Sequence, residues 1–237
     1  MFSRLFSLTG TQDCYFCGAT CNASLCDGCS AALPRLPAAR CPCCALPAPE
    51  SRHCGRCLSE EPHYDTTAAA LAYGYPLDAA IQAFKYRNAL GLTRSFVALM
   101  DQAIGQPPRI DLVIPTPLSQ PHLAERGYNQ AHELARGIAQ RRRLPLDAQA
   151  LIRHQQGPAQ AQLPWKERAK NIRGAFSTAR RFDGLHVAVV DDVMTTGATL
   201  NEMAKTLKKA GAAQVSNWVL ARTLPAVMNP VKAQVKA

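Results

Sequence analysis

The chain has 237 residues, 47% hydrophobic and 19% charged, which is enough to fold one α/β domain beside a smaller module. This composition excludes a disordered chain, and no apolar run approaches the ~18 residues that a transmembrane helix needs. The net charge of +10 favours polyanionic partners. Residues 1–8 are too short for the apolar core of a signal peptide, so we expect a cytoplasmic protein.

All ten cysteines lie before residue 58, and eight of them form four Cys-x-x-Cys pairs. Two such pairs present four thiolates to one tetrahedral Zn²⁺, and the absence of an export signal argues against disulfides. We therefore predict two structural zinc sites formed by sequential pairing, while an interleaved pairing stays open. The predicted metal ligands are Cys14, Cys17, Cys26, Cys29, Cys41, Cys44, Cys54 and Cys57.

Residues 1–62 form the predicted zinc module, in which Cys21 and Cys43 are spare, although Cys43 could replace its neighbour Cys44 as a ligand. The module has five basic and five acidic side chains, and two Zn²⁺ with eight thiolates add a formal −4. An acidic module does not suit a phosphate backbone, so we interpret it as structural or protein-binding. We expect the metal to supply its folding free energy and its core to be separate from that of the second domain.

Residues 63–237 alternate between strand and helix patterns, which predicts a doubly wound parallel sheet flanked by helices. Strands are expected at 67–75, 110–114, 150–153, 187–190 and 215–220. Helices are expected at 77–86, 90–104, 128–142, 164–172 and 199–210. Ligands of such sheets bind beyond the C-terminal strand ends, where Pro115-Thr116-Pro117 and the residues after 190 both lie.

Residues 187–199 combine a valine-rich strand, two acids and a small-residue loop that opens a helix. Glycine lets backbone N–H groups converge on phosphate oxygens, and a helix N-terminus favours an anion. Asp191 and Asp192 can accept hydrogen bonds from vicinal ribose hydroxyls. The segment therefore predicts a site for a phosphorylated sugar; the alternative is an ordinary strand followed by a polar loop. Rival phosphate motifs are missing, because Gly197 is not followed by Lys-Ser/Thr and no Gly-x-Gly-x-x-Gly occurs.

The positive charge concentrates in residues 136–181, where eleven basic side chains face two acidic ones. Three explanations stay open: a patch that attracts nucleic acid or another polyanion, cations that face a pyrophosphate, or a solvated helix face. The run Arg141–Arg143 is the densest part of this segment.

The 187–199 segment resembles the 5-phosphoribosyl-1-pyrophosphate (PRPP) motif of type I phosphoribosyltransferases. Further short motifs precede it in a fixed order: Lys85-Tyr86-Arg87, Pro115-Thr116-Pro117, Arg126-Gly127-Tyr128-Asn129-Gln130, Gln160-x-x-Leu163-x₄-Arg168-x-x-Asn171 and Ala175-Phe176. Together with the cysteine pairs, they resemble the competence protein F (ComF, GntX-like) family from Cys14 to about Arg222. The sequence departs from that family at two positions. It has Ala45 where the family favours glycine, and it has an additional cysteine, Cys43.

The resemblance implies a double zinc ribbon joined to a type I phosphoribosyltransferase domain that binds PRPP with Mg²⁺. It assigns the ribose hydroxyls to Asp191 and Asp192, the 5-phosphate to Thr195, Thr196, Gly197, Ala198 and Thr199, and the pyrophosphate side to Thr116. Arg126, Asn129 and Gln130 are expected to line the cleft, with a helix N-terminus bearing exposed polar residues as the alternative. Lys85, Arg168 and Asn171 are further candidates, and Asp191, Asp192, Lys85 and Arg126 are the catalytic candidates.

Two classes of function follow from this. The first is a transferase that displaces pyrophosphate from PRPP with an unidentified acceptor. The second is a PRPP-binding, non-catalytic accessory factor in DNA uptake that handles single-stranded DNA or contacts a DNA-uptake or helicase partner. Only about ten residues, 58–67, link the last cysteine to the first expected strand, so we also expect the zinc module to close over the PRPP crevice as a hood.

Overall fold

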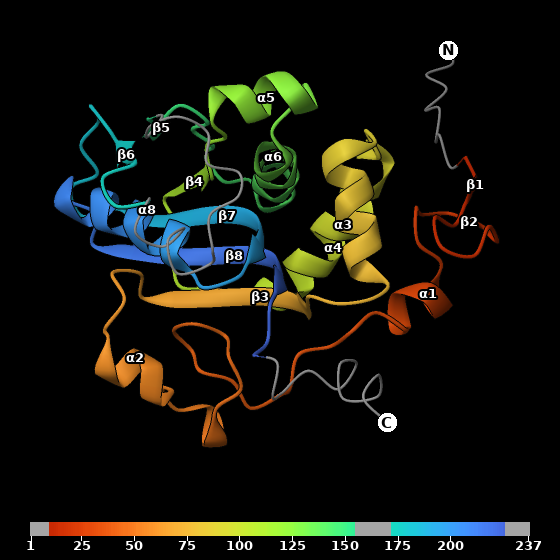
Figure 1. The fold of residues 1–237 in the computed structure, drawn as a ribbon, viewed down its shortest axis with the longest axis horizontal. Coiled ribbons are helices and arrows are strands. Elements are labelled where there is room, and N and C mark those ends of the chain that lie inside the picture. The colour runs from red at the N-terminus through yellow and green to blue at the C-terminus, as the bar shows by residue number, and fades with distance from the viewer. Residues whose placement is uncertain (1–9, 155–171, 226–237) are drawn as a thin grey trace, which may run out of the picture.

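The computed structural model describes residues 10–154 and 172–225. Four parallel strands form the central sheet in the order β3-β8-β7-β4 (Figure 1). They are β3 (Thr66–Ala72), β4 (Leu112–Pro115), β7 (His186–Met194) and β8 (Gln214–Arg222). The prediction of a parallel sheet flanked by helices is confirmed.

Helices cover both faces of the sheet because side chains along a strand alternate between its faces. On β7, Val187 and Val189 pack with α8 (Ala198–Lys209), whereas Ala188 and Val190 point to the other face. That second face is covered by α3 (Leu77–Tyr86), α4 (Thr93–Ile104) and α6 (Gln130–Arg142). Among the described residues, no helix has both the length and the apolar composition to cross a membrane.

The smaller elements lie around this core. The antiparallel pairs are β1 (Gln12–Asp13) with β2 (Thr20–Cys21), and β5 (Ile152–Arg153) with β6 (Phe176–Ser177). The short helices are α1 (Asp27–Ala31), α2 (Gly55–Ser59) and α5 (Gln120–Arg126), and the 3-10 turns are η1 (Pro49–Ser51) and η2 (Leu90–Leu92).

Several elements differ from the sequence-based expectation. The strand expected at 150–153 is reduced to β5, which pairs antiparallel with β6 outside the parallel sheet. Strand β7 continues through both acids to Met194, because each residue of this extension except Asp192 is in register with a residue of β8. The helix expected from residue 90 begins with η2 and becomes α-helical at Thr93. Helix α5 was not expected; its proline stands in the first turn, where no intrahelical N–H is needed. The helix expected at 164–172 lies almost wholly outside the described residues.

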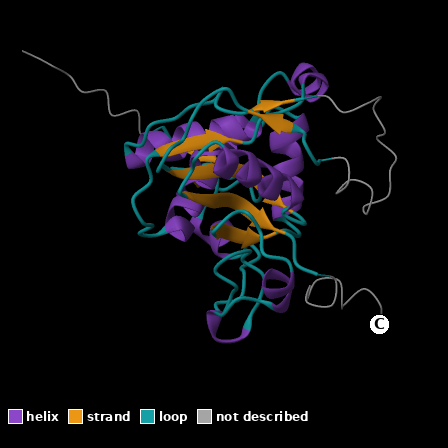
Figure 2. Cartoon of the chain, turned by 90° about the vertical axis from the view of Figure 1, so that its left-hand side faces the viewer, coloured by secondary structure: helices purple, strands orange, loops and turns teal. Residues whose placement is uncertain are grey.

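The cysteine-rich segment divides into two parts that pack on different places of the sheet domain (Figures 1 and 2). Leu25 and Leu33 join the core of α3, α4 and α6, while Cys44 and Cys57 join the core of α8. The expectation of separate cores is therefore wrong. Backbone carbonyls of residues 34 and 42 also accept N–H groups of β3, which covers an edge strand of the sheet.

Candidate functional site

The acidic pair lies near the C-terminal end of β7, and one member is paired with a lysine from α3. Lys85 Nζ lies 2.9 Å from Asp192 Oδ2, and both side chains are largely buried. Burial alone would lower the pKa of Lys85, but the two carboxylates hold that pKa above its ordinary value. Burial and the charge of Asp192 raise the pKa of Asp191 to about 7, against the opposing effect of Lys85. Two carboxylates and one ammonium thus share a single site.

The loop after β7 forms a small cavity of about 30 Å³, lined by Asp191 and residues 193–200. Gly197 has φ +85° and is the N-cap residue of α8. The N–H of Ala198 donates to Thr196 Oγ1 at 3.1 Å, whereas the next amides of the helix N-terminus have no intrahelical acceptor and can bind an anion. The positive φ of Gly197 strains any residue with a side chain, and a Cβ at this position would also lie 2.6 Å from Met194 Cε and 3.1 Å from Tyr64 Oη, so both the backbone and the packing favour glycine here. The predicted phosphate residues, 195–199, all line this cavity.

A larger cavity of about 190 Å³ lies next to the loop cavity, and Asp191 and Thr199 line both of them. Thr116 lines it, and its Oγ1 is buried without a hydrogen-bond partner among the described residues. Arg126 also lines it and donates to Gln130 Oε1 at 3.0 Å and to Tyr86 Oη at 3.0 Å. With Asp191, Asp192 and a second arginine in its lining, the cavity combines two carboxylates, a hydroxyl and two guanidinium groups.

Asn129 and Gln130 differ in their placement. Asn129 does not line the cavity: its Oδ1 accepts from the N–H of Ala131 and its Nδ2 donates to the carbonyl of Thr116 at 2.9 Å. Asn129 therefore caps the N-terminus of α6 and holds the backbone of Thr116. This placement matches the alternative interpretation, a helix N-terminus with polar residues, better than a lining residue of the cleft. Gln130 lines the cavity and is almost fully buried. Arg168 and Asn171 lie outside the described residues.

Two residues that the sequence reasoning did not select as site residues also line the larger cavity, Arg153 from β5 and His122 from α5. Burial lowers the pKa of Arg153, and the nearby Asp191 carboxylate opposes this shift. The guanidinium lies over the ring of Phe176 on the partner strand β6. The sequence gave little sign of Arg153, because β5 has only two residues and such a short strand shows no alternation that would assign its side chains to one face.

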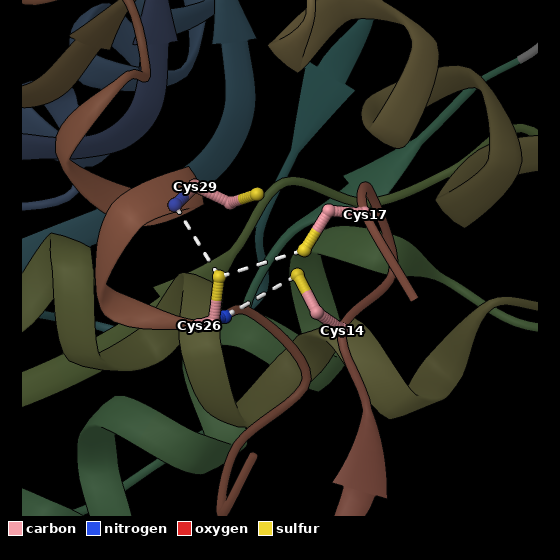
Figure 3. Close-up of side chains that lie close together, drawn as sticks. All are labelled: Cys14, Cys17, Cys26 and Cys29. Atoms are coloured by element: carbon pink, nitrogen blue, oxygen red, sulfur yellow. Dashed lines mark hydrogen bonds between the residues drawn. The ribbon is translucent and has the colours of Figure 1, made fainter. Parts of the chain in front are cut away.

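The eight predicted metal ligands form two clusters, each with its four sulfurs within 4.8 Å of one another. The pairing is sequential, which resolves the alternative of interleaved pairs. Figure 3 shows the four side chains of the first cluster converging, with Cys17 and Cys26 sulfurs 3.7 Å apart. In the second cluster, the sulfurs of Cys44 and Cys54 are 3.5 Å apart. A tetrahedral ion with about 2.3 Å metal–sulfur bonds requires sulfur separations of about 3.8 Å, so both clusters fit it.

Backbone amides prepare these thiols for a cation. Burial opposes the ionisation of Cys14 and Cys41, yet N–H groups directed at their sulfurs lower the pKa values to about 6 and about 7. Neighbouring sulfurs raise the pKa of Cys29 to about 12, because adjacent thiolates repel one another without a metal. The spare Cys43 is buried and donates to the carbonyl of Tyr64, outside the second cluster.

The cysteine-rich segment contacts the loop after β7, whose residues 195–199 are the predicted phosphate ligands and which is called the phosphate loop below, but it lines neither cavity. The described residues that line the cavities all lie between 116 and 200, so the expected hood is not formed by residues 10–62. Instead, Arg56 on α2 donates to the carbonyl of Thr196, and Tyr64 packs beneath Gly197. Ala45, where we noted a departure from glycine, has φ +58°, in the left-handed region that glycine favours.

Comparison with known proteins agrees with this architecture. The phosphoribosyl transferase domain family matches residues 123–234. Competence protein F of Haemophilus influenzae is 35% identical over 181 residues, covering 73% of this chain and 79% of that protein. DNA utilization protein YhgH of Escherichia coli K12 is 31% identical over 207 residues, covering 84% and 91%. A solved allosteric regulatory enzyme of purine biosynthesis aligns at 22% identity and TM-score 0.38, over 54% of this chain and 25% of that one. The identity to competence protein F over most of both chains shows that the chain belongs to the competence protein F family, and its phosphoribosyl transferase domain spans residues 123–234.

Proposed function

We propose that the protein binds PRPP with Mg²⁺ across the two adjoining cavities. The observation that carries this proposal is the shared wall: Asp191 and Thr199 border both the loop cavity and the larger one. A ligand with a phosphate at one end, a diol in its middle and a pyrophosphate at the other end matches that order of donors and acceptors.

In this arrangement the loop holds the 5-phosphate through its amides and through the hydroxyls of its threonines. Asp191 and Asp192 accept hydrogen bonds from the ribose hydroxyls, and the ion pair with Lys85 orients the carboxylate of Asp192. Thr116 and Arg153 lie on the side left for the pyrophosphate, where bound Mg²⁺ would neutralise further charge.

The reaction that suits such a site is the displacement of pyrophosphate from C1 of the ribose. The bond from C1 to the pyrophosphate oxygen breaks, a bond from C1 to the acceptor forms, and the acceptor loses its proton. The leaving group takes the electron pair, so cations near it stabilise the transition state. Within the described residues, Arg126 and Arg153 are the cations that line the larger cavity beside the acidic pair.

Release of pyrophosphate tests catalysis. Metal-loaded protein is incubated with PRPP and Mg²⁺, with or without nucleobases or single-stranded DNA, and pyrophosphate is measured. We expect release that depends on one acceptor and is lost when Asp191 and Asp192 are both replaced. Binding of PRPP without release under every condition would contradict transfer and support a non-catalytic PRPP-binding protein.

We also propose that both cysteine clusters hold structural Zn²⁺. Four thiolates with tetrahedral spacing and no open position are the donor set of structural zinc, and the spare cysteines stand outside both clusters.

A second candidate function is the handling of single-stranded DNA. Relatives bear the names competence protein F and DNA utilization protein, and this chain has a basic cavity of about 530 Å³ between β6 and α8. Its basic residues are Arg173, Arg180, Arg181, Lys205 and Lys209. Among the described residues, Lys205 and Lys209 form no ion pair, so both are open to phosphates.

The run at 141–143 is a weaker choice for such contacts than its charge density suggested. Arg141 and Arg142 both pair with Asp101, and Arg142 also donates to the carbonyls of Asp101 and Gly105. These bonds join α6 to α4 and leave fewer donors for phosphate.

If the α8 cavity binds single-stranded DNA, replacing Lys205 and Lys209 with alanine should flatten the salt dependence of binding. Each lost phosphate contact changes the slope of log K against log[salt] by about 0.7, so a change of about 1.4 is expected. Fluorescence anisotropy with an oligonucleotide at several salt concentrations measures it. Arg141→Ala is the matched control and should leave the slope close to that of the wild type. An unchanged slope in the double variant would contradict this candidate.

A further inference from the structure

Arg222, the last residue of β8, is only 1% exposed, and no carboxylate pairs with its charge in the described part of the chain. The hydrogen bonds of its guanidinium go to backbone carbonyls, and the Cys44 thiol also lies close enough to attract its charge. Nε donates to Cys44 at 2.8 Å, and Nη1 donates to Met194 at 2.9 Å, to Thr223 at 3.0 Å and also to Thr195. Burial lowers the pKa of this arginine. A buried charge is expensive unless it is hydrogen-bonded, so these carbonyls form a dedicated receptor for it.

Arginines hold three consecutive carbonyls of the phosphate loop. Arg222 takes those of Met194 and Thr195, and Arg56 takes that of Thr196. In a planar trans peptide the N–H points opposite to the C=O. The N–H groups of residues 195–197 are therefore turned away from the arginines, and the described residues offer them no acceptor. Residues 195–197 line the loop cavity, so the arginines hold the amide donors in the orientation an anion there requires.

Both arginines also belong to the surroundings of the second cysteine cluster. The carbonyl that fixes Arg222 is that of Cys44, one of the four cluster residues. Arg56 immediately precedes Cys57, another member, on helix α2. The first cluster lies elsewhere, beside Leu25, which packs in the core of α3, α4 and α6. Among the described residues, no hydrogen bond joins its cysteines to residues 194–197.

We propose that Arg222, assisted by Arg56, is a positioning residue that couples the second cysteine cluster to the phosphate loop. This inference rests on the proposed function, in that it makes PRPP affinity depend on an ordered second metal site. A metal ion that fixes Cys44 and Cys57 also fixes the positions of Arg222 and Arg56. The two arginines in turn fix the orientation of the amides of the phosphate loop. Linkage makes the effect reciprocal, so the phosphorylated ligand also stabilises the second cluster.

The first test compares Arg222→Met with Arg142→Met in the zinc-loaded full chain. Arg142 is a matched control because it also donates to two backbone carbonyls, those of Asp101 and Gly105, but lies away from the loop. Calorimetry with PRPP and with ribose 5-phosphate should give about a tenfold higher Kd for Arg222→Met and no change for Arg142→Met. Lowered thermal stability in both variants with unchanged Kd in both would overturn the proposal.

The second test is a double-mutant cycle between the arginine and the metal site. Cys57→Ser should raise the Kd for ribose 5-phosphate about as much as Arg222→Met, and the double variant should be no worse than either. Cys14→Ser, which disturbs the first cluster, should bind as the wild type does. Additive effects of Cys57→Ser and Arg222→Met would mean that the arginine does not carry the coupling.

Hydrogen exchange of the peptide covering residues 197–204, in which the N–H of Asn201 donates to the carbonyl of Gly197, is measured without ligand and separates this inference from the proposed function. Faster exchange in Arg222→Met, but not in Arg142→Met, supports the coupling even if the wild type binds no PRPP, an outcome that would refute only the proposed function. Unchanged exchange overturns the coupling. If Arg222→Met does not fold, the exposed Arg56→Met serves instead, with an expected Kd increase of about threefold and the same exchange criterion.

Discussion

Replacing Asp191 and Asp192 together with asparagine should raise the Kd for PRPP at least about 100-fold. A hydrogen bond to a charged group contributes about 1.5–3 kcal/mol, and about 1.4 kcal/mol corresponds to a factor of ten in Kd. Asparagine keeps the size of each side chain, but it replaces one acceptor oxygen of each carboxyl group with an NH₂ donor. It also leaves Lys85 in the cavity wall without its carboxylate partner, which disturbs the site further. Isothermal titration with Mg²⁺-PRPP measures the change.

Asp111→Asn is the matched control for this double variant. Asp111 is also a partly buried carboxylate next to β7; it pairs with Arg109 and accepts the N–H of His186 at the other end of that strand. Its replacement should lower thermal stability without changing PRPP affinity. Unchanged affinity in the Asp191/Asp192 variant, with retained fold and zinc content, would refute the proposed binding site.

Much of the site was predictable because its signals are local. The eight metal ligands follow from the Cys-x-x-Cys spacings, although the structure was needed to decide between sequential and interleaved pairing, and the acid-loop-helix string is contiguous. Glycine at 197 needed no tertiary information, since its left-handed backbone belongs to the loop itself. The alternation of strands and helices likewise predicted the parallel sheet.

The remainder depends on contacts between distant segments, which no local pattern encodes. Arg222 follows an apolar strand and looked like a strand end, but its function comes from Cys44 and the loop far away in sequence. Arg153 enters the cavity only because β5 pairs with β6 across a long insertion. The sequence left three explanations open for the basic segment, and it gave no sign that Arg141 and Arg142 both form ion pairs with Asp101.

Purified, reduced protein should contain two zinc ions per chain, and variants of the two clusters should each lose about one. Cys14→Ser removes a ligand from the first cluster and Cys57→Ser removes one from the second. Cys21→Ser is the control, because Cys21 lies outside both clusters and donates to the carbonyl of Ala23. Elemental analysis after gel filtration gives the stoichiometry, and one zinc or none in the wild type would contradict the assignment.

The stability of these variants tests how closely the clusters are joined to the sheet. Cys44 and Cys57 share a core with Val187, Val189 and helix α8, so loss of the second metal should weaken the whole domain. Structural zinc contributes several kcal/mol to folding, and about 1 kcal/mol shifts Tm by about 2–4 °C in a protein of this size. A drop of roughly 10 °C is therefore expected for Cys57→Ser, with one cooperative transition in far- and near-UV circular dichroism. If a chelator instead left the Tm of the sheet domain unchanged, the shared core would contribute little and the metal would stabilise only residues 41–57.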